Sequence, residues 1–374
     1  MRVLQVITQD RGGPVDHAVD VAVELAALGL DSHLAGPPGA YPGRLAGTGA
    51  TWHELAVRTK HDVAGARQLG RLMRSVQPDV VHLQDRRAGL HGRVLARVLG
   101  LPSVYTLHGV ADAAAHLIPG NLRVAPLSGH AGAARTAPES VFARLLPGRI
   151  VTPCAALADY AIRRVHVPPR SVTVVPNGVG PQWFRPRRRT DRSGATTVAW
   201  LGVMAPVKRV PALVRAAAGV AELRLLLIGD GPQRPDVERA IAECGLRDRV
   251  ELTGFVDDPY PLLARASAFV LPSAAEACPM ALLQAMAAGL PVIASAAGGI
   301  PEIVRHEVDG LLVPTGDDTA LRGALRRVVQ DAELRSALGC AARQRIAEGF
   351  TLRSCTERLV AVYEDAVSSR GAVA

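Results

Sequence analysis

The sequence predicts an α/β protein built from two doubly wound domains, each with a parallel sheet covered by helices. Short apolar, β-branched runs alternate with longer segments of helical period along the chain. The alternation stops over residues 176–196, which are rich in Pro, Gly and Arg, and then restarts. The length of 374 residues is enough for two hydrophobic cores. Open parallel sheets bind ligands beyond the carboxyl ends of their strands, so we expect these ends to face a central cleft.

The first domain is expected to contain strands at residues 3–7, 32–35, 80–83, 103–107, 149–152 and 172–175, with helices between them. Gly12, Gly13 and Pro14 follow the first strand and open a helix that ends near Leu28, where Gly29 is a typical stop signal. Because glycine has no Cβ, the pair Gly12 and Gly13 would allow a phosphate or an acceptor to approach the backbone.

The second domain is expected to contain strands at residues 198–201, 223–228, 250–252, 268–271, 291–294 and 311–313. A last helical segment follows at 352–368. We place the domain boundaries at 1–180 and 195–350, and residues 176–196 are the predicted linker.

Composition indicates a folded globular protein, with 21% charged and 48% hydrophobic residues. The N-terminus becomes polar by Thr8 and lacks the apolar core of a signal peptide, and the apolar stretch 281–300 is interrupted by Gln284, Gly289 and Pro291. Five dispersed cysteines without a CxxC pair indicate neither a disulfide framework nor a zinc site. We therefore expect a cytoplasmic protein, and the high Ala, Arg and Gly content is typical of a GC-rich bacterial genome.

The net charge of +9 has three interpretations: a solvated basic surface, a dock for anionic lipid headgroups, or a nucleic-acid interface. Aromatic residues are only 3% of the chain, and no basic stripe is interleaved with aromatic side chains. Nucleic-acid binding is therefore the weakest of the three, and the solvated surface is favoured.

Residues 269–304 contain the most informative motif. An apolar run ends at Pro272, Glu276 follows in a loop, and Pro279 suits the first turn of the next helix. The free amides of such a helix start bind a diphosphate well, while a carboxylate accepts hydrogen bonds from sugar hydroxyls. A second strand and a second glycine-led helix start, at Gly298 and Gly299, repeat the arrangement. The motif predicts a nucleotide-sugar site.

This segment resembles the donor-binding signature of family 4 retaining glycosyltransferases, whose GT-B fold has two Rossmann-like domains. Glu276, Ala277, Cys278 and Pro279 fit the signature, whereas its second Glu, eight positions after the first, is Gln284 here. In the family that carboxylate holds the ribose. A glutamine still accepts a hydrogen bond, without the strengthening that charge brings. The resemblance also implies that the last helix crosses back onto the first domain.

The resemblance implies roles for residues of the first domain. His108 ends the run SVYTLHG at a strand tip, where the family has a functional histidine that contacts the donor sugar. Gly12 and Gly13 match the glycine turn before the family's first helix. Asp16 and His17, at the start of that helix, are expected to border the acceptor together with His108. His82 and His91 lack such placement and are interpreted as structural or surface residues.

In the second domain, the resemblance implies that Gly202 and Lys208 belong to the loop that neutralises the diphosphate. The family's arginine in this loop is Val203 here, so Lys208, helped by Arg209, would supply the charge. The remaining expected donor contacts are Gly229 in a base-side turn, Phe255 and Val256 at the nucleobase edge, and Cys278, Pro279, Met280, Ala281 and Gln284 at the helix start.

The resemblance implies a retaining hexosyltransferase that uses a nucleotide diphosphate sugar, with UDP as the expected nucleotide. Glu276, His108 and Lys208 would be its catalytic residues, and neither a metal nor a cofactor is expected. The preferred acceptor is a small molecule, for example in secondary metabolism. One alternative is a lipid or cell-envelope acceptor at a membrane surface. Another is a weakly catalytic partner protein, because Val203, Gln284 and Gly180 depart from the family pattern.

Overall fold

The computed structural model describes residues 1–39, 41–110, 112–124, 146, 148–186 and 195–371. The chain divides into two compact units. The first comprises Met1–Val110, Leu127–Gly178 and Leu352–Ala374, and the second comprises Ala111–Pro126 and Val179–Thr351. The segment Ala111–Pro126, which we had assigned to the N-terminal domain, therefore groups with the second unit.

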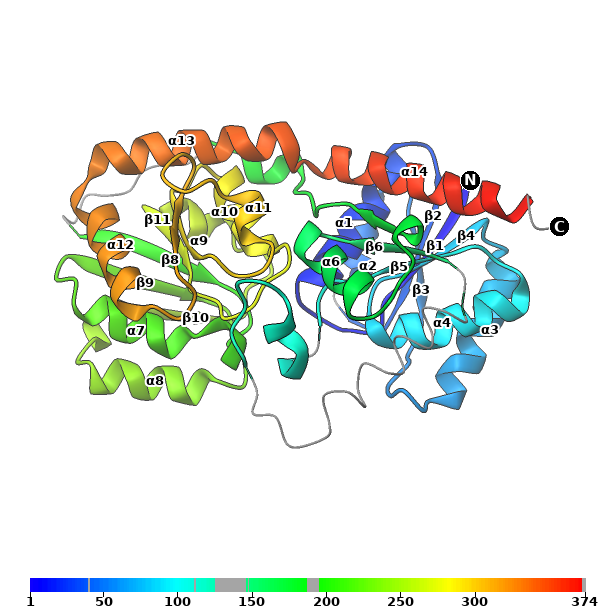
Figure 1. Ribbon diagram of the computed structural model, residues 1–374, viewed down its shortest axis with the longest axis horizontal. Helices are drawn as coiled ribbons and strands as arrows, with labels where there is room; N and C mark the ends of the chain where they lie inside the picture. Colours follow the sequence, from blue (N-terminus) through cyan, green and yellow to red (C-terminus); the bar gives the residue numbers. More distant parts are fainter. Residues whose placement is uncertain (40, 111, 125–145, 147, 187–194, 372–374) are drawn as a thin grey trace. The chain divides into compact units, whose positions relative to one another are not determined.

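The first unit is organised around a seven-stranded parallel sheet (Figure 1). Its order is β3-β2-β1-β4-β5-β6-β7, so the winding direction reverses between β1 and β4. The strands are β1 Arg2–Val6, β2 Asp31–Gly36, β3 Thr51–Glu54, β4 Val80–Leu83, β5 Ser103–Thr106, β6 Arg149–Thr152 and β7 Val172–Val174. Its helices are α1 Gly13–Ala27, α2 Tyr41–Leu45, α3 Val63–Val76, α4 Arg86–Leu99, α6 Ala155–Arg163 and α14 Leu352–Gly371, with the 3₁₀ turn η2 Pro169–Ser171.

The C-terminal helix α14 completes the core of the first unit. It packs against α1, β4 and β5, and appears as the red helix beside them in Figure 1. Leu359 and Tyr363 of α14 share one buried cluster with Val3, Val80 and Val104 of the sheet. Leu359 is only 1% exposed, and fully burying a leucine side chain stabilises a fold by roughly 1.5–3 kcal/mol.

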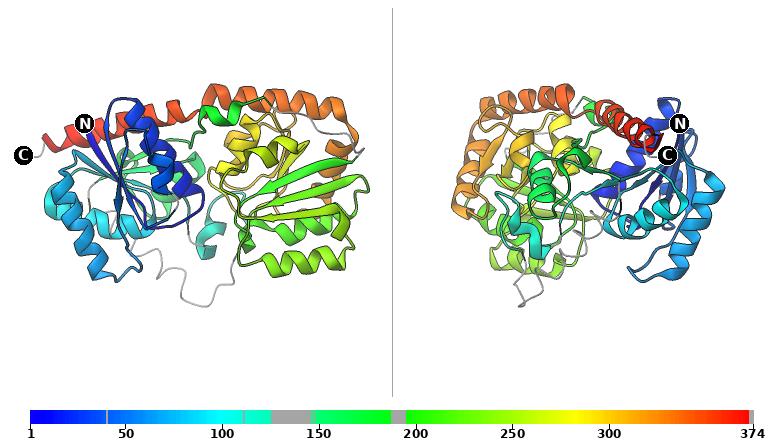
Figure 2. Two further views of the ribbon diagram at one scale, coloured as in Figure 1. Left: turned by 180° about the vertical axis from the view of Figure 1, so that it is seen from behind. Right: turned by 45° about the vertical axis from the view of Figure 1, so that its right-hand side comes forward.

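The second unit has a six-stranded parallel sheet in the order β10-β9-β8-β11-β12-β13. The strands are β8 Thr196–Leu201, β9 Leu223–Ile228, β10 Val250–Gly254, β11 Ala268–Leu271, β12 Val292–Ser295 and β13 Leu311–Val313. Helices cover both faces (Figure 2). They are α7 Val210–Ala218, α8 Arg234–Glu243, α9 Tyr260–Arg265, α10 Met280–Ala287, α11 Ile300–Ile303, α12 Asp318–Gln330 and α13 Ala332–Gly349; short 3₁₀ turns are η1 Asp112–Leu117, η3 Pro181–Phe184, η4 Pro206–Lys208 and η5 Arg247–Arg249.

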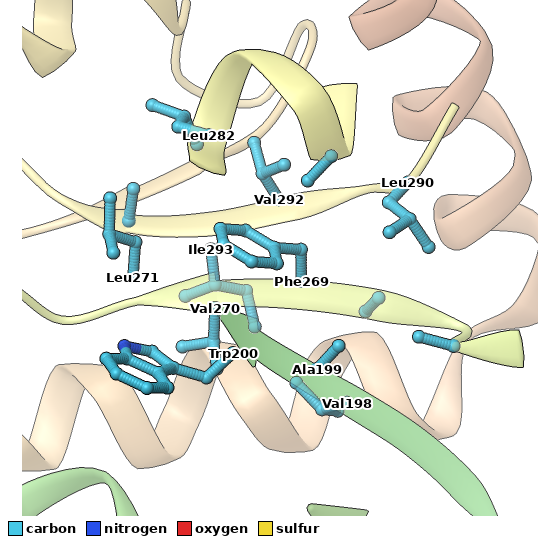
Figure 3. Packing of buried hydrophobic residues seen from close by; sticks show 14 of the residues in the cluster. Val198, Ala199, Trp200, Phe269, Val270, Leu271, Leu282, Leu290, Val292 and Ile293 are labelled. Carbon is cyan, nitrogen blue, oxygen red and sulfur yellow. The ribbon is translucent and has the colours of Figure 1, made fainter. Parts of the chain in front are cut away.

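The core of the second unit explains why its strands read as continuous apolar runs. Parallel strands covered on both faces bury nearly every side chain. Trp200 of β8, Phe269 of β11 and Val292 of β12 are fully buried, and Figure 3 shows them packed together with their neighbours. The two units together give the doubly wound parallel architecture that the sequence predicts.

Candidate functional site

A lysine and a glutamate meet where the sheet of the second unit reverses its winding. The reversal lies between β8 and β11, and ligands of doubly wound sheets bind beyond the strand ends at such a point. Lys208 ends the turn η4 after β8, and Glu276 lies in the loop after β11. Lys208 Nζ lies 2.5 Å from Glu276 Oε1, and the glutamate side chain is only 8% exposed. The structure thus brings together these two predicted site residues.

Backbone contacts hold the loop that carries Lys208. The Ala274 amide donates to the Val207 carbonyl at 2.7 Å, which ties the loops after β8 and β11 together. Gly229 has a φ of 126°, and a Cβ there would lie 2.0 Å from the Gly202 carbonyl oxygen. The turn at Gly229 therefore requires glycine for a close approach to the loop after β8. The turn at Gly229 therefore supports the loop after β8, in addition to the donor contact expected of it.

The predicted phosphate-binding helix start is formed by Pro279 and α10. Pro279 is the N-cap residue, and the first helical hydrogen bonds run from the amides of Leu282 and Leu283 to its carbonyl. The amides of Met280 and Ala281 therefore precede the bonded turn, where a helix presents positive partial charge. The Cys278 and Met280 side chains belong to the apolar core, so only their backbone groups can face a phosphate. Gln284 is 8% exposed within α10.

The second glycine-led helix start does not repeat this arrangement. The helix α11 after Gly298 and Gly299 has only four residues, Ile300–Ile303, which is too short for a substantial helix dipole. Gly298 instead has a packing role. Its φ is 51°, and a Cβ there would lie 1.9 Å from the Glu276 carbonyl oxygen, while the Gly299 amide donates to that same carbonyl at 3.3 Å. This glycine pair supports the Glu276 loop.

Arg209 pairs with the start of α12. Its Nη2 donates to Asp318 of α12 at 2.8 Å and to the Gly316 carbonyl at 3.4 Å. The backbone of Arg209 is left-handed, with a φ of 53°, a conformation that costs a non-glycine residue about 1–2 kcal/mol. Arg209 is thus bound to the start of α12, whereas Lys208 is the cation beside Glu276.

Two large apolar side chains are exposed at the carboxyl ends of the same sheet. Val203 follows β8 and is 39% exposed, and Phe255 follows β10 and is 67% exposed. Val256, the second residue expected at the base edge, is partly buried against the core. An aromatic ring left exposed at this edge is suited to contact a planar base.

The stretch after η1 lies directly against the loop that carries Glu276. The Leu122 amide donates to the Ala274 carbonyl at 2.7 Å, and the Glu276 amide donates to Asn121 Oδ1 at 3.4 Å. Gly120 approaches so closely that a Cβ would lie 2.4 Å from the Ala296 carbonyl oxygen. No sequence motif marks these contacts, because most of them involve backbone atoms.

The first unit has its own winding reversal, between β1 and β4. Asp85 follows β4 and caps α4, accepting from the Arg87 and Ala88 amides at 2.9 and 3.0 Å. Its carboxylate also accepts from the Thr8 amide and hydroxyl at 2.5 and 2.8 Å, which fixes the chain after β1. An Asp directly before a helix is a typical cap signal, so this clamp could have been predicted.

Gly12 and Gly13 begin α1 beyond this clamp. Gly12 is the N-cap with a φ of 102°, in the region that favours glycine, and its carbonyl accepts from the amides of Val15 and Asp16 at 2.9 and 3.1 Å. The pair forms the tight helix start that its sequence indicates.

His17 and His108 lie together in the first unit. Their rings pack edge to face with centroids 5.2 Å apart. Burial lowers the pKa of His17 to about 4, and burial together with the neighbouring His17 and His82 lowers the pKa of His108 well below its usual value. Both rings are therefore neutral at physiological pH and can exchange hydrogen bonds without carrying charge.

Asp16 is held at the surface of α1 by an arginine from α2. Arg44 donates to Asp16 Oδ1 at 2.7 Å and to Asp20 Oδ1 at 2.8 Å. Burial raises the pKa of Asp20 to about 6, against the opposing influence of Arg44. Asp16 faces solvent, with its side chain 42% exposed, whereas His17 is buried and only 2% exposed.

Among the described residues, the functional candidates thus form two groups, Lys208 with Glu276 in the second unit and His17 with His108 in the first. Within the same described ranges, no three His, Cys, Asp or Glu side chains gather as metal ligands. None of the helices in these ranges combines the length and apolar character needed to cross a bilayer.

Two doubly wound parallel-sheet units, the second with a lysine–carboxylate pair at its winding reversal, give this chain the GT-B fold. The model of the family described as Glycosyltransferase Family 4 matches residues 11–183, and that described as Glycosyl transferases group 1 matches residues 195–331. The chain belongs to glycosyltransferase family 4, and it is a glycosyltransferase.

Relatives of known description support this assignment. A D-inositol 3-phosphate glycosyltransferase of Thermobispora bispora is 30% identical, over 96% of this chain and 91% of that protein. A lipopolysaccharide core biosynthesis glycosyltransferase, LpsD of Rhizobium meliloti, is 32% identical, over 54% of this chain and 60% of its own length. The crystal structure of Anabaena HepE in complex with UDP and glucose shares the fold, with a TM-score of 0.82 at 17% identity, covering 98% of this chain and 100% of HepE.

Proposed function

We propose that this protein is a retaining hexosyltransferase that moves a sugar from a UDP-hexose to a hydroxyl group of a small-molecule acceptor. The observation that carries this proposal is the ion pair of Lys208 and Glu276 at the strand ends, next to the start of α10. A cation, free helix amides and a carboxylate side by side suit a diphosphate and a sugar joined in one molecule.

In the proposed reaction, the bond between the anomeric carbon and the β-phosphate oxygen breaks. A bond from that carbon to the acceptor oxygen forms on the same face, so the configuration is retained, and the acceptor proton passes to the departing phosphate. Lys208 and the amides of Met280 and Ala281 meet the charge that develops on the phosphate. Glu276 orients the sugar hydroxyls, and His108 is assigned to the same sugar. These groups supply the positive charge themselves, so the proposal includes neither a metal nor a cofactor.

The choice of UDP and of a small acceptor draws on the relatives. HepE was crystallised with UDP and glucose, and the Thermobispora protein is named for a small phosphorylated cyclitol. In this chain, Phe255 provides an exposed ring for the base, and Gln284 takes the position assigned to ribose recognition. We place the donor site on the second unit and the acceptor contacts at Asp16, His17 and His108.

A thermal-shift panel tests the proposal. Wild-type protein is heated with UDP, GDP and dTDP and with their hexose conjugates, and a ligand that binds the folded state raises the melting temperature. We expect UDP and UDP-hexoses to stabilise, with an additional increment from the sugar that disappears in Glu276→Ala. Stabilisation by the sugar part in Glu276→Ala equal to that in wild type would contradict the assigned role of Glu276.

A cell-envelope acceptor at a membrane surface is the second candidate, favoured by the exposed faces of α3 and α4. Val94 and Val98 on α4 are 40% and 76% exposed, beside the exposed Arg97, and Arg71 and Arg74 are exposed on α3. LpsD, a relative named for lipopolysaccharide core synthesis, supports this alternative. Sedimentation with vesicles containing anionic lipid would reveal it, and loss of binding in Val98→Glu would assign the face.

A weakly catalytic partner protein is the third candidate, because Val203, Gln284 and Gly180 replace the usual residues. Val203→Arg combined with Gln284→Glu distinguishes it from an active enzyme. A large gain in donor turnover would indicate a degraded site, whereas a loss would indicate a site adapted to its present residues.

A further inference from the structure

A buried chain of side-chain hydrogen bonds leads to His108 from the interior of the first unit. His108 Nε2 lies 3.0 Å from Gln84 Oε1, and Gln84 Nε2 donates to Gln5 Oε1 at 2.6 Å. Both glutamines are fully buried on adjacent strands, Gln5 in β1 and Gln84 at the end of β4. Buried amides of this kind have their orientation fixed by their partners, because an unmatched donor or acceptor is costly.

The direction of this chain is set by a backbone carbonyl. Gln5 Nε2 lies 3.4 Å from the Ala18 carbonyl oxygen of α1, which can only accept. The oxygen of Gln5 therefore faces Gln84, so Gln84 must turn its NH₂ group to Gln5. The oxygen of Gln84 then faces His108, and a carbonyl oxygen requires a donor. His108 Nε2 must carry the proton.

The same orientation of Gln84 agrees with the second branch of the network. Gln84 Nε2 lies 3.3 Å from His82 Nδ1, to which the Tyr363 hydroxyl of α14 is also close, at 2.7 Å. His82 Nε2 lies 2.6 Å from the Thr106 hydroxyl oxygen. His82 Nδ1 then accepts from the Tyr363 hydroxyl, with the Gln84 amide as a longer second donor to the same lone pair, and Nε2 donates to Thr106.

We propose that Gln84 is a positioning residue, which holds His108 as the Nε2–H tautomer and so leaves His108 Nδ1 as a hydrogen-bond acceptor for a hydroxyl group of the donor sugar. A neutral imidazole has one donor and one acceptor nitrogen, so fixing one fixes the other. The sugar contact rests on the proposed function, whereas the tautomer rests on the network alone. His108 then orients a hydroxyl and carries no positive charge to the sugar.

The groups that face His108 favour its neutral form. His17 approaches from α1 and His82 from β4, and the pKa values of both are lowered by burial, to about 4 and about 3. The amide of Gln84 adds a dipole and no charge. A carboxylate in place of this amide would stabilise the imidazolium, because an opposite charge at this distance raises a histidine pKa by roughly 1–3 units.

The test uses the full-length protein with ¹⁵N-labelled histidine and reads the imidazole nitrogens by NMR. The His108 signal is assigned by its loss in His108→Gln. In wild type at neutral pH we expect a protonated Nε2 and an unprotonated Nδ1. Gln84→Met should give a mixture of tautomers, and Gln84→Glu should raise the pKa of His108 by at least about one unit. Tyr363→Phe is the matched control, since it removes a bond to His82 and leaves the His108 contact intact.

Kinetics supply the second readout. If His108 accepts from the sugar, Gln84→Met should lower kcat/KM for the donor about tenfold, the cost of one buried hydrogen bond. Gln84→Glu should move the acid limb of the pH–rate profile upward, in step with the NMR titration. An Nδ1–H tautomer in wild type, or a His108 pKa unchanged in Gln84→Glu, would overturn the positioning role. If NMR shows the predicted tautomer but the protein transfers no sugar, the proposed function is overturned and the positioning role of Gln84 stands.

Discussion

Lys208 and Glu276 form an ion pair of 2.5 Å, although they are 68 positions apart in the sequence. The pair bridges the loops after β8 and β11. A diphosphate would take Lys208 as its own partner and release the carboxylate toward the sugar hydroxyls. Under the proposed function, the pair would link recognition of the two halves of the donor.

This pair predicts opposite effects on nucleotide and sugar in Glu276→Gln. The substitution removes the competing carboxylate, so we expect UDP alone to bind at least as tightly as to wild type. Turnover of the UDP-hexose should fall about 100-fold or more, as for other losses of a group that acts on the reacting centre. Calorimetric titration and an assay of released UDP measure the two effects.

Glu307→Gln is the matched control for that substitution. Glu307 pairs with Arg327 at 2.8 Å on the surface of the second unit, and its side chain is 55% exposed. Both UDP affinity and turnover should stay at wild-type values in this variant. Weaker UDP binding by Glu276→Gln would show that the carboxylate supports the diphosphate site rather than competing with it.

The contact between Asn121 and the Glu276 amide predicts a selective effect on the sugar. A single hydrogen bond of this kind contributes about 1 kcal/mol, so Asn121→Ala should raise the KM for the UDP-hexose roughly fivefold. UDP alone should bind as before, because Lys208 is not altered. Steady-state kinetics with UDP as competitive inhibitor separates the two constants. Arg123→Ala, an exposed neighbour, should change neither, and an equal loss of UDP affinity in Asn121→Ala would refute the selective effect.

The buried histidines predict that acid destabilises the protein. The pKa of His17 is lowered from 6.5 to about 4, so below pH 6.5 the unfolded chain binds a proton that the folded one does not. The contribution of neutral His17 to the free energy of unfolding is fully present above pH 6.5. It falls by about 3 kcal/mol as the pH decreases toward 4. Asp20 acts in the opposite direction, because its pKa is raised to about 6 and its contribution falls as the pH rises from 3.8 to 6.

Urea unfolding at several pH values between 5 and 7.5 measures this dependence. His17→Leu should show a smaller loss of unfolding free energy on acidification than wild type, and Asp20→Asn a larger one. An identical pH slope in wild type and His17→Leu would mean that His17 has the same pKa in the folded and unfolded protein, and would contradict the prediction.

Most of the sheet could be predicted because its strands are buried on both faces. Runs such as 223–228 and 268–271 are continuously apolar, which is the signal of a covered parallel strand. The strand β3 was missed because its sequence, Thr51–Glu54, is short and polar, as suits an edge with partly exposed side chains. The alternation of strands and helices predicted where the loops of the site begin.

Lys208 and Glu276 could be assigned to one site for a topological reason. Each follows a parallel strand, and all carboxyl ends of such a sheet lie along one edge. The role of Asn121 could not be predicted in this way, since its approach depends on glycines at 120 and 298 that allow close backbone packing. The partner of Arg209 was also beyond prediction, because Asp318 is 109 positions away and belongs to a surface helix.

Lys208, as the cation for the diphosphate, is the central residue of the proposed donor site. Calorimetric titration of UDP into wild type, Lys208→Met and Arg209→Met tests it. Loss of a charge-assisted contact worth about 1.5–3 kcal/mol should weaken UDP binding by Lys208→Met about 10- to 100-fold. Arg209→Met should bind UDP as wild type does, because Asp318 already holds that guanidinium. Equal affinity of wild type and Lys208→Met for UDP would contradict the account.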